Sequence, residues 1–385
     1  MYSGIWMYAW DLADEGVDHV MSWAAESGLQ ALQVAGAYHA GWFIHPHNPK
    51  HRAYMTEDGC VYFHPEISRY KETALKPKVA SVCSHTDWMR EAGSRLDKHG
   101  LKMVSWTVCT HNTRLGLLHP ECTVRNCFGD SYPHALCPAN PQVRNYLTSL
   151  CGDLANNLPL HAVQLESPGY MGLVHGHHHE RDLTVLTQTE QFLMDLCFCA
   201  SCVRTAESKH VDIEPVRRAV QAILDAGMRA APGRGVGHPQ TVEQVIDAIP
   251  GLDSLLKLRR EVEDTLILDI KAAMKPSTAK LFLLGGQNSI IDPAVDVYNS
   301  GVYGLKPEAV LAATKRAHNG LTARHELYIG VRLGLNSVTD DIELADIVRE
   351  IGAGGGDGVM FYNYSESPMT TLNWIKGALG ASRRS

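Results

Sequence analysis

The chain has 385 residues, of which 45% are hydrophobic and 20% charged, as in ordinary globular proteins. The net charge of −7 and the absence of a basic run exclude nucleic acid as an expected partner. No stretch approaches ~18 consecutive apolar residues, so no membrane span is predicted. The first residues lack the charged segment and cleavage site of a secretory signal. Ten cysteines without such a signal indicate reduced thiols or metal ligands, and we expect a cytoplasmic protein.

Short apolar, β-rich runs alternate with helical patterns along the chain, which is typical of βα units around a parallel sheet. Eight runs are candidate strands: Gly4–Trp10, Ala31–Ala37, Val79–Cys83, Leu101–Cys109, His161–Leu165, Ala279–Leu284, Glu326–Val331 and Gly358–Tyr362. A ninth run, Val295–Val302, competes with them, and we expect Val79–Cys83 to lie outside the barrel. The pattern predicts an α/β protein, a single (β/α)₈ barrel domain over residues 1–385.

Helical periodicity is clear between these runs. Pro141 suits a first helical position, and Gly100 suits the end of a helix from about Asp87 to His99. Further helices are expected from Pro307 to near Gly320 and over Ile342–Ile351. Residues 205–275 contain no strand pattern and predict a helical elaboration between two barrel strands. Its longest helix carries one apolar stripe, formed by Leu255, Leu258, Val262, Leu266 and Ile270.

Three cysteines lie close together in the segment LCFCASC: Cys197, Cys199 and Cys202. Thiolates at this spacing in a reducing compartment are typical of a tetrahedral zinc site. Cys137, just before a helix, is the predicted fourth ligand, with His175 or His179 as substitutes. The alternative is that the thiols are buried packing residues. That is the interpretation of the other cysteines, Cys60, Cys83, Cys109, Cys122, Cys127 and Cys151.

The cysteines belong to a longer pattern: CPANPQVR (137–144), then AVQLESPGY (162–170), then CFCASC (197–202). This order resembles the family-42 β-galactosidases and their retaining-glycosidase relatives over about 65 residues. The resemblance implies a TIM barrel, a structural Cys₄ zinc site and an acid/base role for Glu166 at the end of the fourth strand. It is compatible with a homo-oligomer, because relatives with this zinc site often assemble as trimers. Independently, a carboxylate that follows an apolar barrel strand is well placed for catalysis, although it could instead cap a helix or form an ion pair.

Two departures from the family are visible. The Asn that precedes the catalytic Glu in the family is replaced by Leu165. The run that matches the seventh strand ends at Arg332 without the nucleophilic Glu, and Glu326 lies at its start. Glu366 is therefore the predicted second carboxylate, with Asp11 as a weaker candidate.

Polar and aromatic residues follow several predicted strands, a set suited to a polyhydroxylated ring. Any single one could equally be core packing. The predicted substrate-binding residues are Trp10, Asp11, His39, Trp106, His111, Asn112, Tyr170, His175, His178, Arg332, Tyr362 and Asn363. The tract HGHHHE (175–180) could hold a second metal, but solvated or hydrogen-bonding loop histidines fit it better.

The leading hypothesis is therefore a glycoside hydrolase that acts on a small carbohydrate or glycoconjugate. The alternatives are a metal-dependent sugar isomerase or epimerase and a barrel that only binds sugars. The first is raised by the opening strand–helix–ALQVAGAYH pattern, which is similar to xylose-isomerase-like barrels. The second is raised by the missing carboxylate on the seventh strand.

Overall fold

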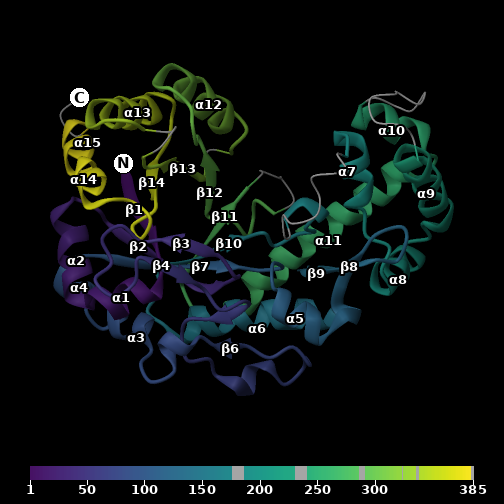
Figure 1. Cartoon of the computed structure of the whole chain (residues 1–385), viewed down its shortest axis with the longest axis horizontal. Helices are drawn as coiled ribbons and strands as arrows, with labels where there is room; N and C mark the ends of the chain where they lie inside the picture. Colours follow the sequence, from purple (N-terminus) through teal and green to yellow (C-terminus); the bar gives the residue numbers. More distant parts are fainter. Residues whose placement is uncertain (176–185, 230–240, 286–290, 323, 335–337, 383–385) are drawn as a thin grey trace.

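Eight parallel strands close into a barrel in the computed structural model (Figure 1). The structure describes residues 1–175, 186–229, 241–285, 291–322, 324–334 and 338–382. Strand β1 pairs with both β14 and β2, which closes the ring. The barrel strands are β1 (Tyr2–Met7), β2 (Ala31–Tyr38), β7 (Lys102–Val108), β10 (Ala162–Glu166), β11 (Lys280–Leu284), β12 (Val297–Gly301), β13 (Glu326–Arg332) and β14 (Gly358–Tyr362). The predicted (β/α)₈ barrel is confirmed.

Eight of the nine predicted strand runs supply the barrel strands. The run Val79–Cys83 lies outside the barrel, as predicted. Lys78–Val79 forms the short strand β6, which pairs with β5 (Cys60–Val61), and a 3₁₀ turn follows it. The ninth run supplies β12, which pairs with β11 and β13.

The prediction that the first strand continues to Trp10 is wrong. β1 ends at Met7, and helix α1 (Ala9–Glu15) begins two residues later. The carboxylate of Asp11 accepts a hydrogen bond from the backbone N–H of Tyr8 at 2.8 Å. This bond satisfies one of the donors that a helix start leaves unpaired, so Trp10 and Asp11 belong to a helix.

Most predicted helices are present with small changes of boundary. The helix expected over Asp87–His99 is divided into two, and Gly100 ends the second with φ of 65°. The helices are α1 (Ala9–Glu15), α2 (Val17–Glu26), α3 (Trp88–Gly93), α4 (Leu96–His99), α5 (Thr113–Leu118), α6 (Pro141–Asn157), α7 (Gln188–Met194), α8 (Ala200–Ser208), α9 (Glu214–Arg229), α10 (Val242–Ala248), α11 (Leu252–Ala273), α12 (Pro307–Asn319), α13 (Asp341–Ala353), α14 (Met369–Leu372) and α15 (Trp374–Ser382).

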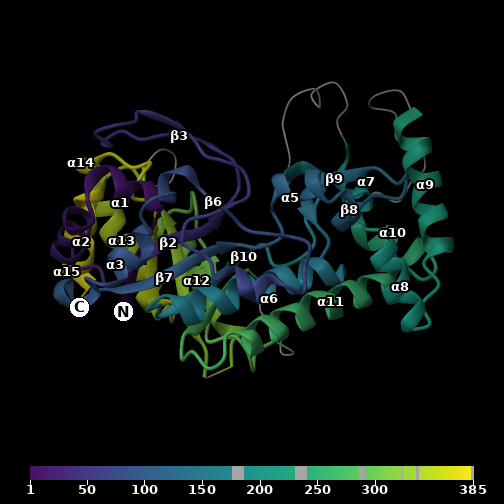
Figure 2. The same cartoon turned by 90° about the horizontal axis from the view of Figure 1, so that it is seen from below.

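Helices α7–α11 lie between β10 and β11 in the chain and have a small hydrophobic core of their own, which includes Val216, Leu224 and Leu255. Figure 2 shows α7, α9 and α10 set apart from the barrel, with α11 running back towards it. The apolar stripe predicted for the longest helix is buried along α11. The described part of 205–275 contains the end of α8 and helices α9, α10 and α11.

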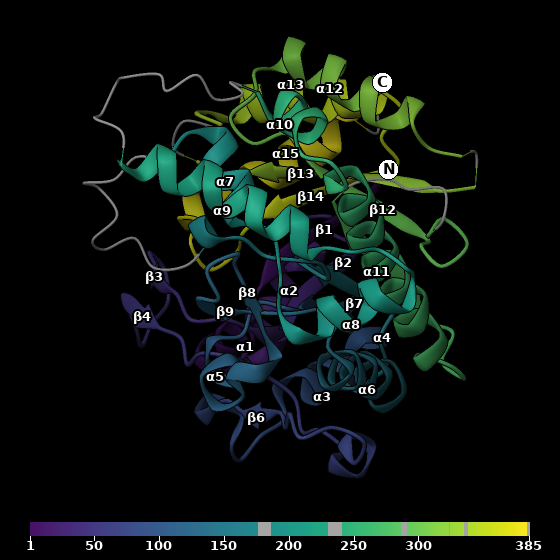
Figure 3. The same cartoon turned by 90° about the vertical axis from the view of Figure 1, so that its right-hand side faces the viewer.

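Two hairpins lie in the loops after β2 and β7. The first consists of β3 (Trp42–Ile44) and β4 (Ala53–Met55) and projects from the molecule at the left of Figure 3. The second consists of β8 (Thr123–Arg125) and β9 (Ser131–Leu136) and leads directly to Cys137. Within the described residues, no helix is both long and apolar enough to cross a membrane.

Candidate active site and cysteine cluster

A chain of hydrogen bonds crosses the interior of the barrel. Trp6 Nε1 donates to Gln164 Oε1 at 2.7 Å, and Gln164 Nε2 donates to Asn299 Oδ1 at 3.1 Å. Because an indole N–H can only donate, it fixes the orientation of both amides. Asn299 Nδ2 has no partner among the described residues, although the side chain is buried. The sequence did not predict this network of hydrogen bonds. The one sign of it in the sequence is that the amides Gln164 and Asn299 lie within apolar strand runs.

A cavity of about 960 Å³ opens at the carboxyl ends of the barrel strands. The last residue of six strands lines it: Tyr38, Glu166, Leu284, Gly301, Arg332 and Tyr362. Trp106, His39 and Asn299 also contribute to its wall. The lining includes Leu327 and Ala317 as well, so part of this volume lies beside α12 rather than over the strand ends. The position and the aromatic content match those of ligand sites in barrel enzymes.

Glu166 is the carboxylate in the cavity wall. It is the last residue of β10, and its backbone oxygen accepts a hydrogen bond from Cys109 N at 2.9 Å. Trp106 Nε1 donates to its side-chain oxygen Oε2. Burial raises the pKa of Glu166, and the Trp106 hydrogen bond only partly opposes this shift. A carboxylic acid with a raised pKa keeps its proton to higher pH than usual, which suits a general acid.

The loop that follows Glu166 is held on both sides. Ser167 has φ of 49°, a left-handed conformation that is uncommon for a residue with a side chain. Thr110 Oγ1 donates to the carbonyls of Ser167 and Gly169 at 2.8 and 2.7 Å. On the other side Glu263 of α11 accepts from Tyr170 N at 2.9 Å. These bonds fix the backbone that carries Glu166.

Glu366 lies in the loop after β14. Its carboxylate accepts a hydrogen bond from Asn363 Nδ2 at 2.7 Å, and its backbone N–H donates to Asn363 Oδ1 at 2.9 Å. Burial raises the pKa of Glu366, while the bond from Asn363 and the charge of Arg332 oppose the shift. Burial raises the pKa of Tyr362, which lines the cavity, and the charges of Glu366 and then Glu166 add to this shift, so the two carboxylates act on one phenol.

Asp11 supports the loop of Glu366 and does not line the cavity. The side chain is fully buried, and Ser365 Oγ donates to its Oδ2 at 2.5 Å. One helical turn further along α1, Glu15 accepts from the hydroxyl of Tyr364 at 2.7 Å. Helix α1 therefore positions the segment that carries Glu366.

Asp11 gives a pH-dependent stability prediction. Burial raises its pKa from 3.8 to about 7, against the hydrogen bonds from Ser365 and Tyr8. The folded protein therefore holds this proton more tightly than the unfolded chain does. We expect Asp11 to lower the free energy of unfolding as pH rises from about 4 to 7, by up to ~1.4 kcal/mol per unit. Denaturant titrations of wild type and Asp11→Asn should show a smaller fall in the variant, and equal slopes would contradict the prediction.

The other predicted substrate-binding residues divide into two groups. His39, Trp106, Arg332 and Tyr362 line the cavity. His111 stacks on His39 with ring centroids 4.2 Å apart, next to the cavity wall. Asn112 instead caps α5, where its Oδ1 accepts from Leu115 N at 2.8 Å.

Trp10 is buried and stacks on Tyr8 with ring centroids 4.1 Å apart. Asn363 is buried against Glu366, as described above. Tyr170 lies at the cysteines rather than in the cavity wall. His175 ends a 3₁₀ turn, its side chain is not described, and His178 lies outside the described residues.

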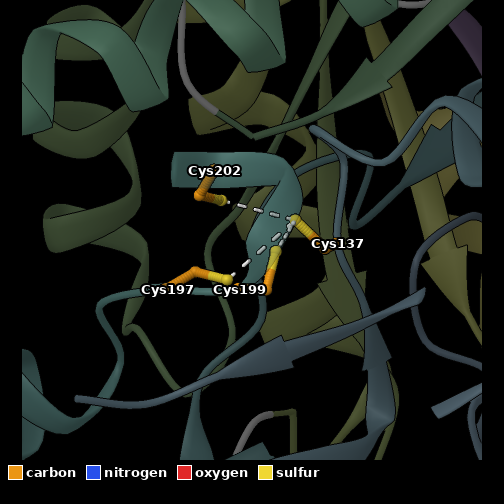
Figure 4. Close-up of side chains that lie close together, drawn as sticks. All are labelled: Cys137, Cys197, Cys199 and Cys202. Carbon is orange, nitrogen blue, oxygen red and sulfur yellow. Dashed lines mark hydrogen bonds between the residues drawn. The ribbon is translucent and has the colours of Figure 1, made fainter. Parts of the chain in front are cut away.

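The four predicted cysteine ligands come together in one buried cluster (Figure 4). Their sulfur atoms all lie within 4.8 Å of one another. The Cys137 sulfur is 3.6 Å from that of Cys202, 3.5 Å from that of Cys199 and 4.0 Å from that of Cys197. Zinc–sulfur bonds of ~2.3 Å in a tetrahedron require sulfur atoms about 3.8 Å apart, so the cluster fits a zinc ion closely. Among the described residues, no other group of three or more His, Cys, Asp and Glu side chains is compact enough to share a metal.

Tyr170 links the cysteine cluster to the loop of Glu166. Its hydroxyl lies 3.4 Å from Cys202 Sγ, and its ring lies under the guanidinium of Arg259 at 4.1 Å. Only three residues separate Tyr170 from Glu166 along the chain. The cluster therefore anchors the far end of the loop that begins at Glu166.

No protein-family model matches this sequence, and neither does any curated protein. Solved structures match in fold. α-L-Fucosidase isoenzyme 2 from Paenibacillus thiaminolyticus has a TM-score of 0.59 and 11% identity, covering 99% of this chain and 49% of its own. A β-galactosidase from Halorubrum lacusprofundi has a TM-score of 0.57 and 10% identity, covering 100% of this chain and 58% of its own.

The glycoside hydrolase domain of PgaB (BpsB) from Bordetella bronchiseptica has a TM-score of 0.52 and 11% identity. That match covers 100% of this chain and 97% of the domain. The chain thus spans about half the length of the fucosidase and somewhat more of the β-galactosidase. At these identities the likeness concerns the fold, and this chain has the TIM-barrel fold seen in these glycoside hydrolase structures.

Proposed function

We propose that this chain is a glycoside hydrolase that acts on a small carbohydrate or glycoconjugate, with Glu166 as the general acid/base. The observation that carries the proposal is a half-buried glutamate with a raised pKa at the end of the fourth barrel strand, in the wall of an aromatic-lined cavity. A protonated Glu166 would donate its proton to the glycosidic oxygen as the bond to the leaving group breaks.

Glu366 is the proposed second carboxylate. Its hydrogen bond from Asn363 and the nearby charge of Arg332 favour the ionised form that a nucleophile or base needs. Burial raises the pKa of Glu166, and no cation of the described residues opposes this shift, so its environment favours the protonated form instead. Two carboxyl groups with different environments are the usual arrangement for acid and base roles in glycoside hydrolysis.

The cavity wall supplies further groups for sugar binding. The rings of Tyr38 and Trp106 lie 5.0 Å apart, nearly perpendicular, and both line the cavity. Aromatic faces pack against the C–H face of a sugar, while hydroxyl and amide groups bind its oxygens. The cysteine cluster would hold a structural zinc ion, which would join the segment at Cys137 to the segment 197–202, and Tyr170 contacts this cluster through Cys202. Ten free cysteines fit a reducing, cytoplasmic setting.

The test is turnover of a panel of 4-nitrophenyl α- and β-glycosides that includes fucosides, galactosides and N-acetylglucosaminides. We expect wild type to release nitrophenol from at least one of them and Glu166→Gln to lose this activity. Glu326→Gln is the matched control, because Glu326 lies at the opposite end of a barrel strand and pairs with Lys280 at 2.6 Å. Equal turnover by wild type and Glu166→Gln would refute the assignment. Sugar binding without turnover of any glycoside would instead favour a non-catalytic sugar-binding barrel.

A further inference from the structure

The guanidinium of Arg332 is a cation in the cavity wall. Arg332 is the last residue of β13, its side chain is exposed, and it lines the cavity wall. In the part of the chain that the structure describes, its guanidinium makes no ion pair within 4.0 Å and no hydrogen bond. A guanidinium carries five N–H donors in a fixed fork, so this position offers several donors for a ligand.

Glu366, whose carboxylate interacts with the charge of Arg332, does not use those donors. Burial raises the pKa of Glu366 and the positive charge of Arg332 opposes this shift, so the two groups interact through space without forming an ion pair. Glu366 itself is held by Asn363. Among the described residues, no carboxylate forms an ion pair with Arg332.

The surface beside Arg332 is formed by small and aromatic residues. Gly330 lies two residues earlier on the same face of β13, and a Cβ built there would come 3.3 Å from the hydroxyl of Tyr303. A Cβ at Gly301, the last residue of β12, would come 3.7 Å from the ring of Tyr303. Tyr303 therefore lies over two glycines and forms an aromatic wall next to the guanidinium. Such a wall suits a sugar ring whose substituent reaches Arg332.

We propose that the substrates are anionic carbohydrates, and that Arg332 binds a carboxylate, sulfate or phosphate group on the sugar. This proposal rests on the proposed function, from which it takes the sugar substrate, and it adds that the sugar carries a negative charge. Planar anions accept two parallel N–H bonds from a guanidinium, which gives both affinity and orientation. A neutral sugar would satisfy few of these donors. Arg332 is in this way the specificity-determining residue of the cavity.

The test is calorimetric binding of glucuronate, galacturonate, glucose 6-sulfate and glucose 6-phosphate, each compared with glucose or galactose. We expect wild type to bind at least one anionic sugar about tenfold or more tightly than its neutral parent, an advantage that raised salt reduces. Arg332→Gln should abolish the advantage, and Arg332→Lys should retain part of it because a point charge replaces the fork. The anionic sugar that binds most tightly identifies the anionic group that Arg332 recognises.

Arg316→Gln is the matched control, since it removes the same charge from the exposed surface of α12 outside the cavity. The proposal is overturned if wild type shows no preference for any anionic sugar, or if the preference survives in Arg332→Gln. Turnover separates this proposal from the proposed function. If the protein hydrolyses neutral glycosides and binds anionic sugars no more tightly than neutral ones, only the proposed role of Arg332 is refuted. Tight binding of an anionic sugar without turnover of any 4-nitrophenyl glycoside or glycuronide would refute only the hydrolase.

Discussion

Replacing Glu166 with glutamine is expected to lower kcat/KM by about 10²–10⁴ for glycosides with poor leaving groups. The amide keeps the size of the side chain, and its oxygen can still accept from Trp106, but it has no acidic proton to transfer to the leaving group. Leaving groups that depart as stable anions need little protonation, so the loss should be much smaller for 2,4-dinitrophenyl than for alkyl glycosides. The measurement is kcat/KM for a series of leaving groups with one sugar. A loss that is independent of the leaving group would indicate a general role in folding or binding.

The pH profile provides the second readout for Glu166. Burial raises its pKa, and a general acid works only when protonated. Activity should therefore fall as pH rises through the raised pKa of Glu166, which places this basic limb above the usual range of a glutamate. The limb should disappear in Glu166→Gln and remain in Glu326→Gln. A basic limb that persists in Glu166→Gln would assign it to another group.

Loss of the metal from the cysteine cluster is expected to have the largest effect on stability. Zinc bound to closed thiolate sites contributes about 10–16 kcal/mol of apparent binding free energy in small peptides. The four sulfur atoms are buried together, and without an ion they leave buried thiols in place of strong bonds. We expect one zinc per chain by elemental analysis, none in Cys137→Ser, and a melting temperature lowered by many degrees in that variant and in chelated wild type.

Cys83→Ser is the matched control for this experiment. Cys83 is also a buried free thiol, but its sulfur contacts the backbone carbonyl of Tyr62, and a serine could do the same. It should keep one zinc and most of the stability. Metal content of zero in wild type purified without chelators, or a full complement in Cys137→Ser, would refute a four-cysteine zinc site. Since Tyr170 connects the cluster to the loop of Glu166, glycosidase activity should fall with the metal.

The sequence alone was sufficient for the barrel and for the cysteine cluster. Strand and helix periodicities are local properties, and eight βα alternations leave few ways to bury their apolar faces except by closing a barrel. The spacing C-x-C-x-x-C is local as well. Cys137 is predictable as the fourth ligand because it lies just before a helix, in the segment order CPANPQVR, AVQLESPGY, CFCASC. The position of Glu166 followed from the end of its strand, since barrel strands present their last residues to one face.

The tertiary structure decided which polar residues face the cavity. Tyr8 and Trp10 have strand-forming side chains, but the hydrogen bond from Tyr8 N to Asp11 begins a helix there and turns Asp11 towards Ser365. The orientation of Asn299 depends on Trp6 and Gln164 from two other strands, a relation that no single segment contains. Arg332 lines the cavity without an ion pair to any described residue, and Glu263 of α11 binds the backbone N–H of Tyr170 beside the cysteines. Sequence patterns determine which elements form, whereas the partners of a buried or cavity-facing polar group come from distant segments and are set only when the barrel closes.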